Sequence, residues 1–149
     1  MIKKLIIFVL FTTYLFSNTF EVNKKIDNFS LVDQFDKKHT VKNDIKIIIV
    51  SFEKGTGADI NEFLSKKPSD FLVTNQAVFI ADISGMPSII TSMFALPKMR
   101  KYKHTILLIY DEEDKRFIQK DDYLTLYKLE NGVIKSISYV KKEDLKKVF

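Results

Sequence analysis

The 149-residue chain contains no cysteine. Without a thiol there is no cysteine nucleophile, no thiolate ligand for a metal ion and no thiol–disulfide exchange. A domain of about 130 residues can nevertheless be stable outside the cell without disulfides, because the buried fraction of the surface rises with chain length. The missing cysteines therefore exclude sulfur redox chemistry but do not exclude an exported protein.

Arginine is scarce, since Arg100 and Arg116 are the only two among 24 basic residues. Setting residues 1–17 aside removes Lys3 and Lys4, and 24 minus 2 leaves 22 basic against 19 acidic side chains, a net charge of +3. The lysines are interspersed with acidic residues rather than gathered in one stripe. Bidentate recognition of phosphates and base edges favours arginine, so we expect no nucleic-acid partner.

Histidine is scarce as well, with only His39 and His104 in the chain. A metal site built on two histidines needs further ligands, and no spacing in the sequence supplies them. The acidic run at 111–114 lacks the Asp-x-Asp-x-Asp-Gly spacing of a calcium-binding loop, so it is interpreted as a solvated loop. The sequence predicts no metal site and no catalytic Ser-His-Asp set.

The N-terminus has the order of a secretory signal peptide. Met1–Lys4 is short and basic, Leu5–Phe16 is uncharged and mostly apolar, and Ser17 begins a small polar stretch. The apolar run is shorter than the roughly 20 residues that span a bilayer as a helix. We therefore predict a signal peptide at 1–17 and a mature domain at 18–149, exported and most simply periplasmic. Residues 1–17 left uncleaved would instead tether the domain to the membrane.

Patterns of apolar residues predict one α/β domain. Strands are expected at 28–33, 38–42, 45–52, 77–83, 105–110, 123–129 and 133–140. Helices are expected from Asp59 to about Lys67, from Pro87 to Pro97, and over 142–149. The Asn131-Gly132 pair is the strongest hairpin signal in the chain. The order predicts a central mixed sheet flanked by helices, with a β-hairpin at its N-terminal end.

Three segments resemble the thioredoxin-like superfamily, in particular its exported peroxiredoxin and cytochrome-maturation members. "FSLVDQFDKKHTV" is similar to their entry hairpin, "IKIIIVSFEKGTGADINEFL" to the first core strand, active-site turn and helix, and "TLYKLENGVIKSISYVKKEDLKKVF" to the terminal hairpin and helix. The likeness covers most of residues 27–149 and implies a thioredoxin-like fold. It says little about activity, because one fold hosts many functions.

The chain departs from that family where its chemistry resides. Catalytic members carry one or two cysteines in the turn that here reads Lys54 to Asp59. Thr56 resembles the threonine that precedes the reactive cysteine of peroxiredoxins, but no cysteine follows, and a hydroxyl without a nearby base is not an activated nucleophile. Members also place a cis-proline before a strand that often begins Pro-Thr. The residues at the two candidate positions are His104 and Leu124.

A dinucleotide-binding turn is the alternative interpretation of the same stretch. Gly55-Thr56-Gly57 begins a G-x-G-x-x-G pattern after a strand, and Asp82 follows Gly57 by 25 positions, about where a ribose-binding acid is expected. The third glycine is replaced by Ile60, and the chain leaves little room for a substrate domain. Under this hypothesis the protein is a small flavin- or nicotinamide-binding oxidoreductase with Gly55, Gly57 and Asp82 at its cofactor.

The leading hypothesis is an exported, non-redox thioredoxin-like domain that acts by binding, with no cofactor. Its partner is expected to be another periplasmic protein or a peptide, because the N–H groups at the start of a helix attract anions and carboxylates. The sequence predicts no oligomeric state. The candidate partner surface consists of Glu53, Lys54, Gly55, Thr56, Gly57 and His104.

Overall fold

The computed structural model describes residues 18–149, and the predicted signal peptide lies outside them. The strands are β1 (Phe29–Asp33), β2 (Lys38–Val41), β3 (Ile47–Ser51), β4 (Ala77–Asp82), β5 (Leu107–Ile109), β6 (Leu124–Glu130) and β7 (Val133–Val140). The helices are α1 (Lys54–Ser65), α2 (Phe71–Thr74), α3 (Ser88–Ile90), the π-helical turn η1 (Thr91–Ala95), α4 (Leu96–Met99) and the 3-10 helix η2 (Lys142–Lys147).

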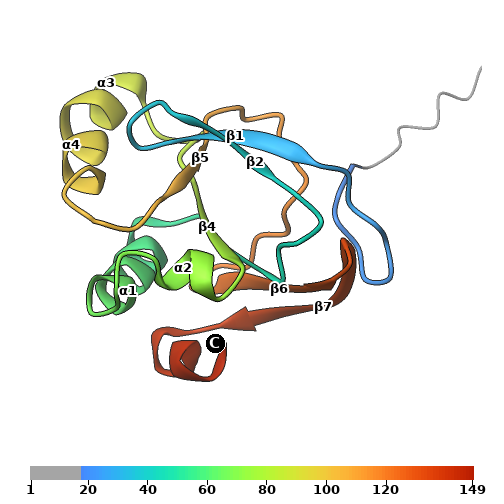
Figure 1. Cartoon of the computed structure of the whole chain (residues 1–149). Helices are drawn as coiled ribbons and strands as arrows, with labels where there is room; N and C mark the ends of the chain where they lie inside the picture. Colours follow the sequence, from blue (N-terminus) through green and yellow to red (C-terminus); the bar gives the residue numbers. More distant parts are fainter. Residues whose placement is uncertain (1–17) are drawn as a thin grey trace, which may run out of the picture.

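The strands form one mixed sheet in the order β2-β1-β5-β4-β3-β6-β7 (Figure 1). The central strands β3, β4 and β5 are parallel, whereas β6 is antiparallel to β3 and β1 is antiparallel to β5. The hairpins β1–β2 and β6–β7 form the two edges. This arrangement confirms the predicted mixed sheet and its N-terminal hairpin.

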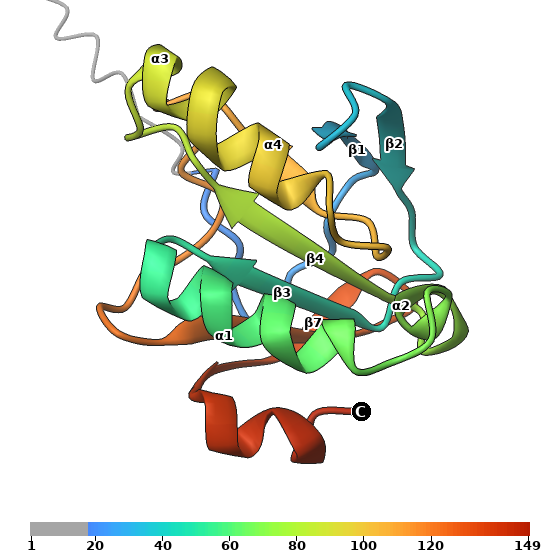
Figure 2. The same ribbon diagram turned by 90° about the vertical axis from the view of Figure 1, so that its left-hand side faces the viewer.

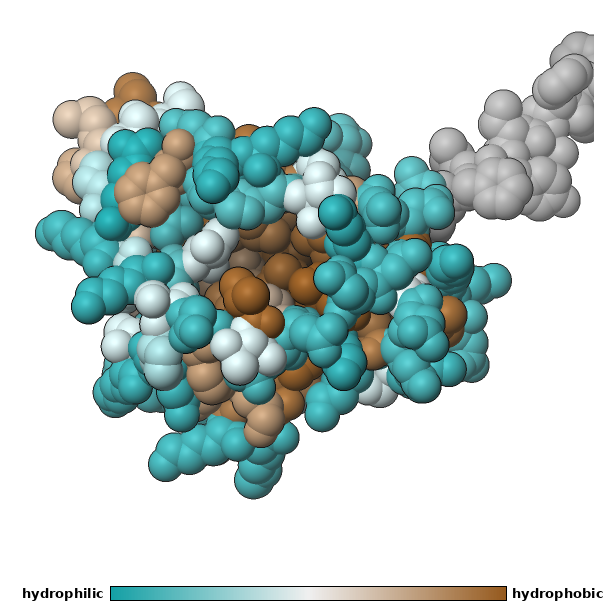
Figure 3. Space-filling view, viewed as in Figure 1, coloured by the Kyte–Doolittle hydropathy of each residue, from teal (hydrophilic) through white to brown (hydrophobic). Residues whose placement is uncertain are grey.

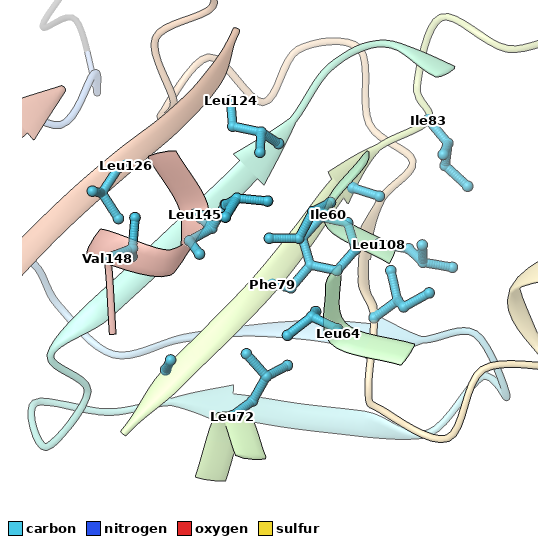
Figure 4. Close-up of a cluster of buried hydrophobic side chains, with 14 residues drawn as sticks. Ile60, Leu64, Leu72, Phe79, Ile83, Leu108, Leu124, Leu126, Leu145 and Val148 are labelled. Atoms are coloured by element: carbon cyan, nitrogen blue, oxygen red, sulfur yellow. The ribbon is translucent and has the colours of Figure 1, made fainter. Parts of the chain in front are cut away.

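Helices cover one face of the sheet. In Figure 2, α1 and the α3–η1–α4 segment lie side by side in front of β3 and β4, with η2 below α1. Their apolar side chains meet those of the strands in one buried cluster, in which Ile60 and Leu64 of α1 surround Phe79 of β4 (Figure 4). Leu145 of η2 is fully buried in the same cluster. This helical face is the one that carries the candidate site.

The opposite face is closed by chain segments instead of helices. The rings of Phe20, Phe29, Phe117 and Tyr127 pack edge to face or tilted, with ring centroids 5.1 to 6.2 Å apart. The buried Tyr127 hydroxyl accepts a hydrogen bond from the backbone N–H of Ile118 at 2.8 Å. Burial raises the pKa of this phenol to about 12. We call these four rings the aromatic seal.

The Asn131-Gly132 hairpin between β6 and β7 is confirmed. Asn131 and Gly132 have φ angles of 50° and 78°, the left-handed conformation that a two-residue type I′ turn needs at both positions. A Cβ atom at Gly132 would lie 2.8 Å from Oδ1 of Asn43, so the exposed Asn43 side chain would have to move, and the positive φ is the stronger reason for glycine here. The β6–β7 register that follows is regular except for a shift at Lys128/Leu129.

The predicted start of the first long helix is wrong. Asp59 does not cap the helix, because α1 begins at Lys54 with Glu53 in extended conformation as its N-cap residue. The N–H of Gly57 and the hydroxyl of Thr56 both bond the carbonyl of Glu53. Tertiary packing of Thr56 and Ile60 on the sheet outweighs the low helix propensity of two glycines, so Gly55 and Gly57 form the first helical turn.

Pro97 does not end the second helical segment, which continues to Met99. A proline inside a helix normally loses one hydrogen bond and clashes with the carbonyl four residues earlier. Here the five residues before Leu96 form a π-turn, whose wider i to i+5 bonding changes the carbonyl that faces Pro97. Pro97 accordingly sits at the start of a new α-helical turn instead of breaking the segment.

Candidate functional site

A pocket of about 590 Å³ opens where β3 and β4 end, between α1 and the α3–η1–α4 segment. Several residues predicted from the sequence line this pocket. Glu53, Lys54 and Gly57 line it from the start of α1, and Asp82 lines it from β4. Gly55 lies on the exposed outer side of the same helical turn, and Thr56 is buried beneath it. The walls are mostly apolar, with Ile83, Met86, Ile90, Phe94, Met99 and Tyr102 among them.

His104, the remaining predicted residue, is 4% exposed and lies beneath the pocket instead of on the surface. Its Nε2 bonds Oδ1 of Asn61 at 2.8 Å, which fixes Nε2 as the donor. Burial lowers the pKa of His104 to about 4, so the ring is neutral at physiological pH. Asn61 and Tyr102 both line the pocket and both contact this ring, Tyr102 with centroids 5.2 Å apart. His104 therefore supports two pocket residues from behind.

A buried glutamine holds the segment around His104 in place. The Gln34 side chain donates to the carbonyl of His104 and accepts from the N–H of Ile106, both at 2.9 Å. Arg100 donates from Nε to the backbone carbonyl of Gln34 at 2.7 Å. Since Gln34 directly follows β1, these bonds fix the rear of the pocket to the sheet.

Two buried polar side chains offer unused hydrogen-bonding atoms to the pocket. The Ser51 hydroxyl, on a residue 3% exposed, makes no hydrogen bond within residues 18–149, and neither does the amide nitrogen of Asn61, on a residue 7% exposed. No fully enclosed side-chain nitrogen or oxygen in the described part of the chain lacks a partner. Both atoms must therefore reach open space, and both residues line the pocket. A bound polar group would satisfy them.

Two acidic and two basic side chains line the pocket, so its lining carries no net formal charge. The Glu53 carboxylate accepts hydrogen bonds from the N–H of Asp122, and Asp82 accepts from the N–H and hydroxyl of Ser84. Lys54 and Lys98 also line the pocket, and neither forms an ion pair within residues 18–149. The first N–H groups of α1 add the positive end of a helix dipole on the same side. The N–H groups and Lys54 at the start of α1 therefore favour a hydrogen-bond-accepting group on that side of the pocket, whereas Glu53 and Asp82 offer acceptors.

Thr56 and His104 are both engaged in hydrogen bonds within the chain. The Thr56 hydroxyl donates to the carbonyl of Glu53 at 3.2 Å and has no base beside it. His104 makes its Nε2 bond to Asn61 and does not line the pocket. Within residues 18–149 no three His, Asp or Glu side chains are grouped to hold a metal ion, and no helix there is long and apolar enough to span a bilayer.

The pocket geometry does not favour the dinucleotide alternative. Gly55 and Gly57 have ordinary helical backbone, and a Cβ atom at either one would meet nothing closer than 3.5 Å. Neither glycine is therefore needed for a tight turn of the chain. Ile60, in the place of the third glycine, is fully buried against the sheet, and Asp82 is already bonded to Ser84.

Neither of the two candidate positions for the family's cis-proline, His104 and Leu124, holds a proline. Leu124 begins β6 next to β3 and is 1% exposed. No peptide bond within residues 18–149 is cis. The extended-peptide clamp that the resemblance associates with this proline is thus missing together with the cysteines.

No family model and no curated protein matches the chain. Solved structures do: a peroxiredoxin-like protein from Aquifex aeolicus has a TM-score of 0.53 and 9% identity, over 88% of this chain and 89% of its own. The thioredoxin domain of a thiol-disulfide oxidoreductase from Bacteroides vulgatus has a TM-score of 0.56 and 11% identity, over 87% and 95%. The chain therefore has a thioredoxin-like fold, carried by a sequence without cysteine.

The sequence predicted the stretch at residues 53–57 but not most of the other residues that line the pocket. Ser51, Asn61 and the helix residues Ile90 and Phe94 were not predicted. One signal was available for Asn61: it is the polar residue in the apolar stripe of α1, between Ile60 and Leu64. A buried polar residue needs a partner, which the structure identifies as His104.

Proposed function

We propose that this chain is an exported thioredoxin-like domain that acts in the periplasm by binding, as a non-redox accessory protein. The observation that carries the proposal is the pocket at the start of α1, where unused donors of Ser51 and Asn61 lie among apolar walls. In the resembling family this end of the first helix carries the reactive cysteine. Here the same position offers a mostly apolar cavity with unused hydrogen-bond donors in place of a nucleophile.

The proposed partner is another periplasmic protein or a peptide. A cavity of this size lies in the range of about 300–1,000 Å³ that ordered ligands or inserted side chains occupy. Lys54 and the first N–H groups of α1 suit a carboxylate, and the apolar walls suit bulky side chains. Periplasmic location is supported by the order of basic, apolar and small polar residues in 1–19.

Affinity capture from the periplasm of the native host tests the binding function. The baits are the wild-type mature chain and an Ala58→Phe variant, because Ala58 lies at the exposed mouth of the pocket and a ring there would fill it. Lys54→Glu, a further bait, reverses a charge at the pocket. Lys46→Glu is its control, since Lys46 is exposed at the other end of β3.

We expect a partner that wild type and Lys46→Glu retain and that both pocket variants lose, with all four proteins showing the same thermal unfolding midpoint. A partner retained by Ala58→Phe would place the binding surface elsewhere. Fractionation of the native host, followed by the intact mass of the protein, tests export and cleavage near residue 17. A full-length mass in the membrane fraction would establish a tethered form.

A further inference from the structure

The pocket at the start of α1 has a buried floor without charge. Its buried lining residues, which we call the floor, are Ser51, Asn61, Phe79, Ala81 and Ile83. The charged lining residues, two acidic and two basic, are all partly or fully exposed. An ionised group at the floor would therefore be buried without a buried counter-charge, which is costly. The group that reaches the floor should be uncharged.

The Ser51 hydroxyl is open to the pocket because of Gly57. Ser51 ends β3 on the same face of that strand as Ile49, which packs in the cluster under α1. A Cβ atom added to Gly57 would lie 3.5 Å from Oγ of Ser51. Since glycine has no side chain, nothing from this position covers the hydroxyl, and both residues line the pocket.

Asn61 presents its amide nitrogen to the same pocket. It follows Gly57 by four residues on α1, and residues at this spacing share one face of a helix. Its Oδ1 accepts the hydrogen bond from His104, so Nδ2 is the atom left for a ligand. A serine hydroxyl donates or accepts, whereas an amide nitrogen only donates. A group that satisfies both side chains must therefore contain a hydrogen-bond acceptor.

The walls above the floor are apolar and continue to the surface of the domain. Ile90 and Phe94 line the pocket and are 43% and 63% exposed. Hydrophobic residues reach the surface over α3, at the upper left of the space-filling view (Figure 3). Met86 and Met99 also line the pocket, and methionine side chains adapt to the shape of a ligand. The pocket thus suits an apolar body with one uncharged polar group at its inner end.

We infer that the floor of the pocket binds an uncharged amide group, whose carbonyl oxygen accepts hydrogen bonds from the Ser51 hydroxyl and from Nδ2 of Asn61. The inference rests on the proposed binding function and names the group of the partner that enters the pocket. A carboxylate is charged and an ammonium group has no acceptor atom, so neither matches the floor. An amide also has N–H groups, for which Glu53 and Asp82 offer acceptors in the lining. In a protein partner this group is a side-chain carboxamide or a backbone peptide group.

Three ligands with one carbon skeleton test the inference: 3-phenylpropanamide, 3-phenylpropanoate and 3-phenylpropylammonium. Each is titrated into the isotope-labelled mature chain, and the side-chain amide signals of Asn61 are followed by NMR. The control signals are those of Asn75, whose Nδ2 already donates to the carbonyl of Phe71 at 2.8 Å. The titrations are repeated with Ser51→Ala, with Asn61→Asp and with Ser136→Ala, a control at an exposed position of β7.

We expect the amide to shift the Asn61 signals, to leave those of Asn75 in place, and to bind at least about tenfold more tightly than either charged ligand. Ser51→Ala should weaken amide binding about three- to tenfold, as expected for one neutral hydrogen bond. Asn61→Asp should weaken it at least about tenfold, because it replaces the donor by an acceptor while keeping Oδ1 for His104. Ser136→Ala should bind like wild type.

Several outcomes would overturn the inference. One is a carboxylate or ammonium ligand that shifts the Asn61 signals as strongly as the amide does; a carboxylate held only by Lys54 at the mouth would leave those signals in place. Another is amide binding that Ser51→Ala leaves unchanged, and this variant decides the matter if Asn61→Asp does not fold. No shift with any ligand at millimolar concentration would mean that solvent alone satisfies the floor.

N-methyl-3-phenylpropanamide distinguishes the two sources of the amide. Tighter binding of this secondary amide identifies a backbone peptide group, and tighter binding of the primary amide identifies a side-chain carboxamide. A captured partner that Ala58→Phe loses and Asn61→Asp retains would overturn the inference and leave the proposed binding function standing. Capture that Ala58→Phe does not affect would count against the proposed function itself.

Discussion

The two faces of the sheet use the same kinds of side chain for opposite purposes. On one face the aromatic seal packs Phe20, Phe29, Phe117 and Tyr127 against one another, and its single hydroxyl is bonded to Ile118. On the other face, Phe94 stands in solvent beside a pocket in which Ser51 has an unused hydroxyl. Both faces therefore contain a buried apolar cluster, and the helical face in addition leaves large apolar side chains at its surface beside an unused hydroxyl group.

The largest expected effect comes from truncating one ring on each face. Phe117→Ala should lower the free energy of unfolding by about 3–5 kcal/mol, because it leaves a cavity among buried rings. Phe94→Ala should change it by less than about 0.5 kcal/mol, because the ring is mostly exposed. Urea denaturation of both variants measures the difference. Similar losses of unfolding free energy in both variants would show that Phe94 is part of the core.

As the pH falls, the helix-covered face of the sheet should be destabilised before the face that carries the aromatic seal. The pKa of His104 is lowered by burial from 6.5 to about 4, so the unfolded chain binds a proton that the folded chain does not. Stability is therefore complete above about pH 6.5 and falls as the pH decreases toward 4, by ~3 kcal/mol in all. The aromatic seal titrates only through Tyr127, near pH 12.

Thermal unfolding of wild type and of His104→Gln across pH 4 to 7 measures this effect. The variant should lose the slope between pH 6.5 and 4, because glutamine does not titrate. Asp33, whose pKa lies below its ordinary value of 3.8 because bonds from His39 and the backbone outweigh its burial, would account for a loss at lower pH. A slope that survives in the variant would mean that His104 is not its source.

Removing one hydroxyl group from each face should give a smaller difference in the free energy of unfolding. Tyr127→Phe should cost about 1–3 kcal/mol, because it leaves the partly buried N–H of Ile118 without its acceptor. Ser51→Ala should cost less than about 0.5 kcal/mol, because that hydroxyl has no partner in the described chain. Chemical denaturation checks both values. A substantial cost for Ser51→Ala would show that its hydroxyl is structural.

The smallest expected effect is a gain in stability from a substitution in the first turn of α1. Gly55→Ala should stabilise the protein by up to about 1 kcal/mol, because Gly55 is helical and a Cβ atom there meets nothing within 4 Å. A shift of the thermal unfolding midpoint measures it. Destabilisation would indicate that the turn needs a conformation that only glycine adopts, as the dinucleotide hypothesis requires.

The sequence predicted the elements whose signals are local. The apolar run at 45–52 contains β3, and Asn131-Gly132 forms the turn that this dipeptide favours. The start of α1 was missed because two glycines disfavour a helix and Asp59 is a good capping residue, whereas contacts of Thr56 and Ile60 with the sheet decide the outcome. Local propensity is outweighed where a helix packs on a core.

The site was only partly predictable for a related reason. Apolar residues at 89–94 have the same pattern whether a helix is buried or exposed, and no later segment of the described chain covers them. Their exposure therefore became visible only in the structure. His104 was predicted to lie on the partner surface because the resemblance placed its loop there, but its side chain points to Asn61 and is buried.

The π-turn at Thr91–Ala95 has a consequence for how this protein can vary. A single π-turn holds about one residue more than the α-helix around it needs. Deleting one residue from the turn would leave a continuous α-helix, in which the Pro97 ring would clash with the carbonyl four residues before it. The extra residue is therefore what allows the chain to stay helical from Ser88 to Met99, and a deletion there should bend or shorten the segment.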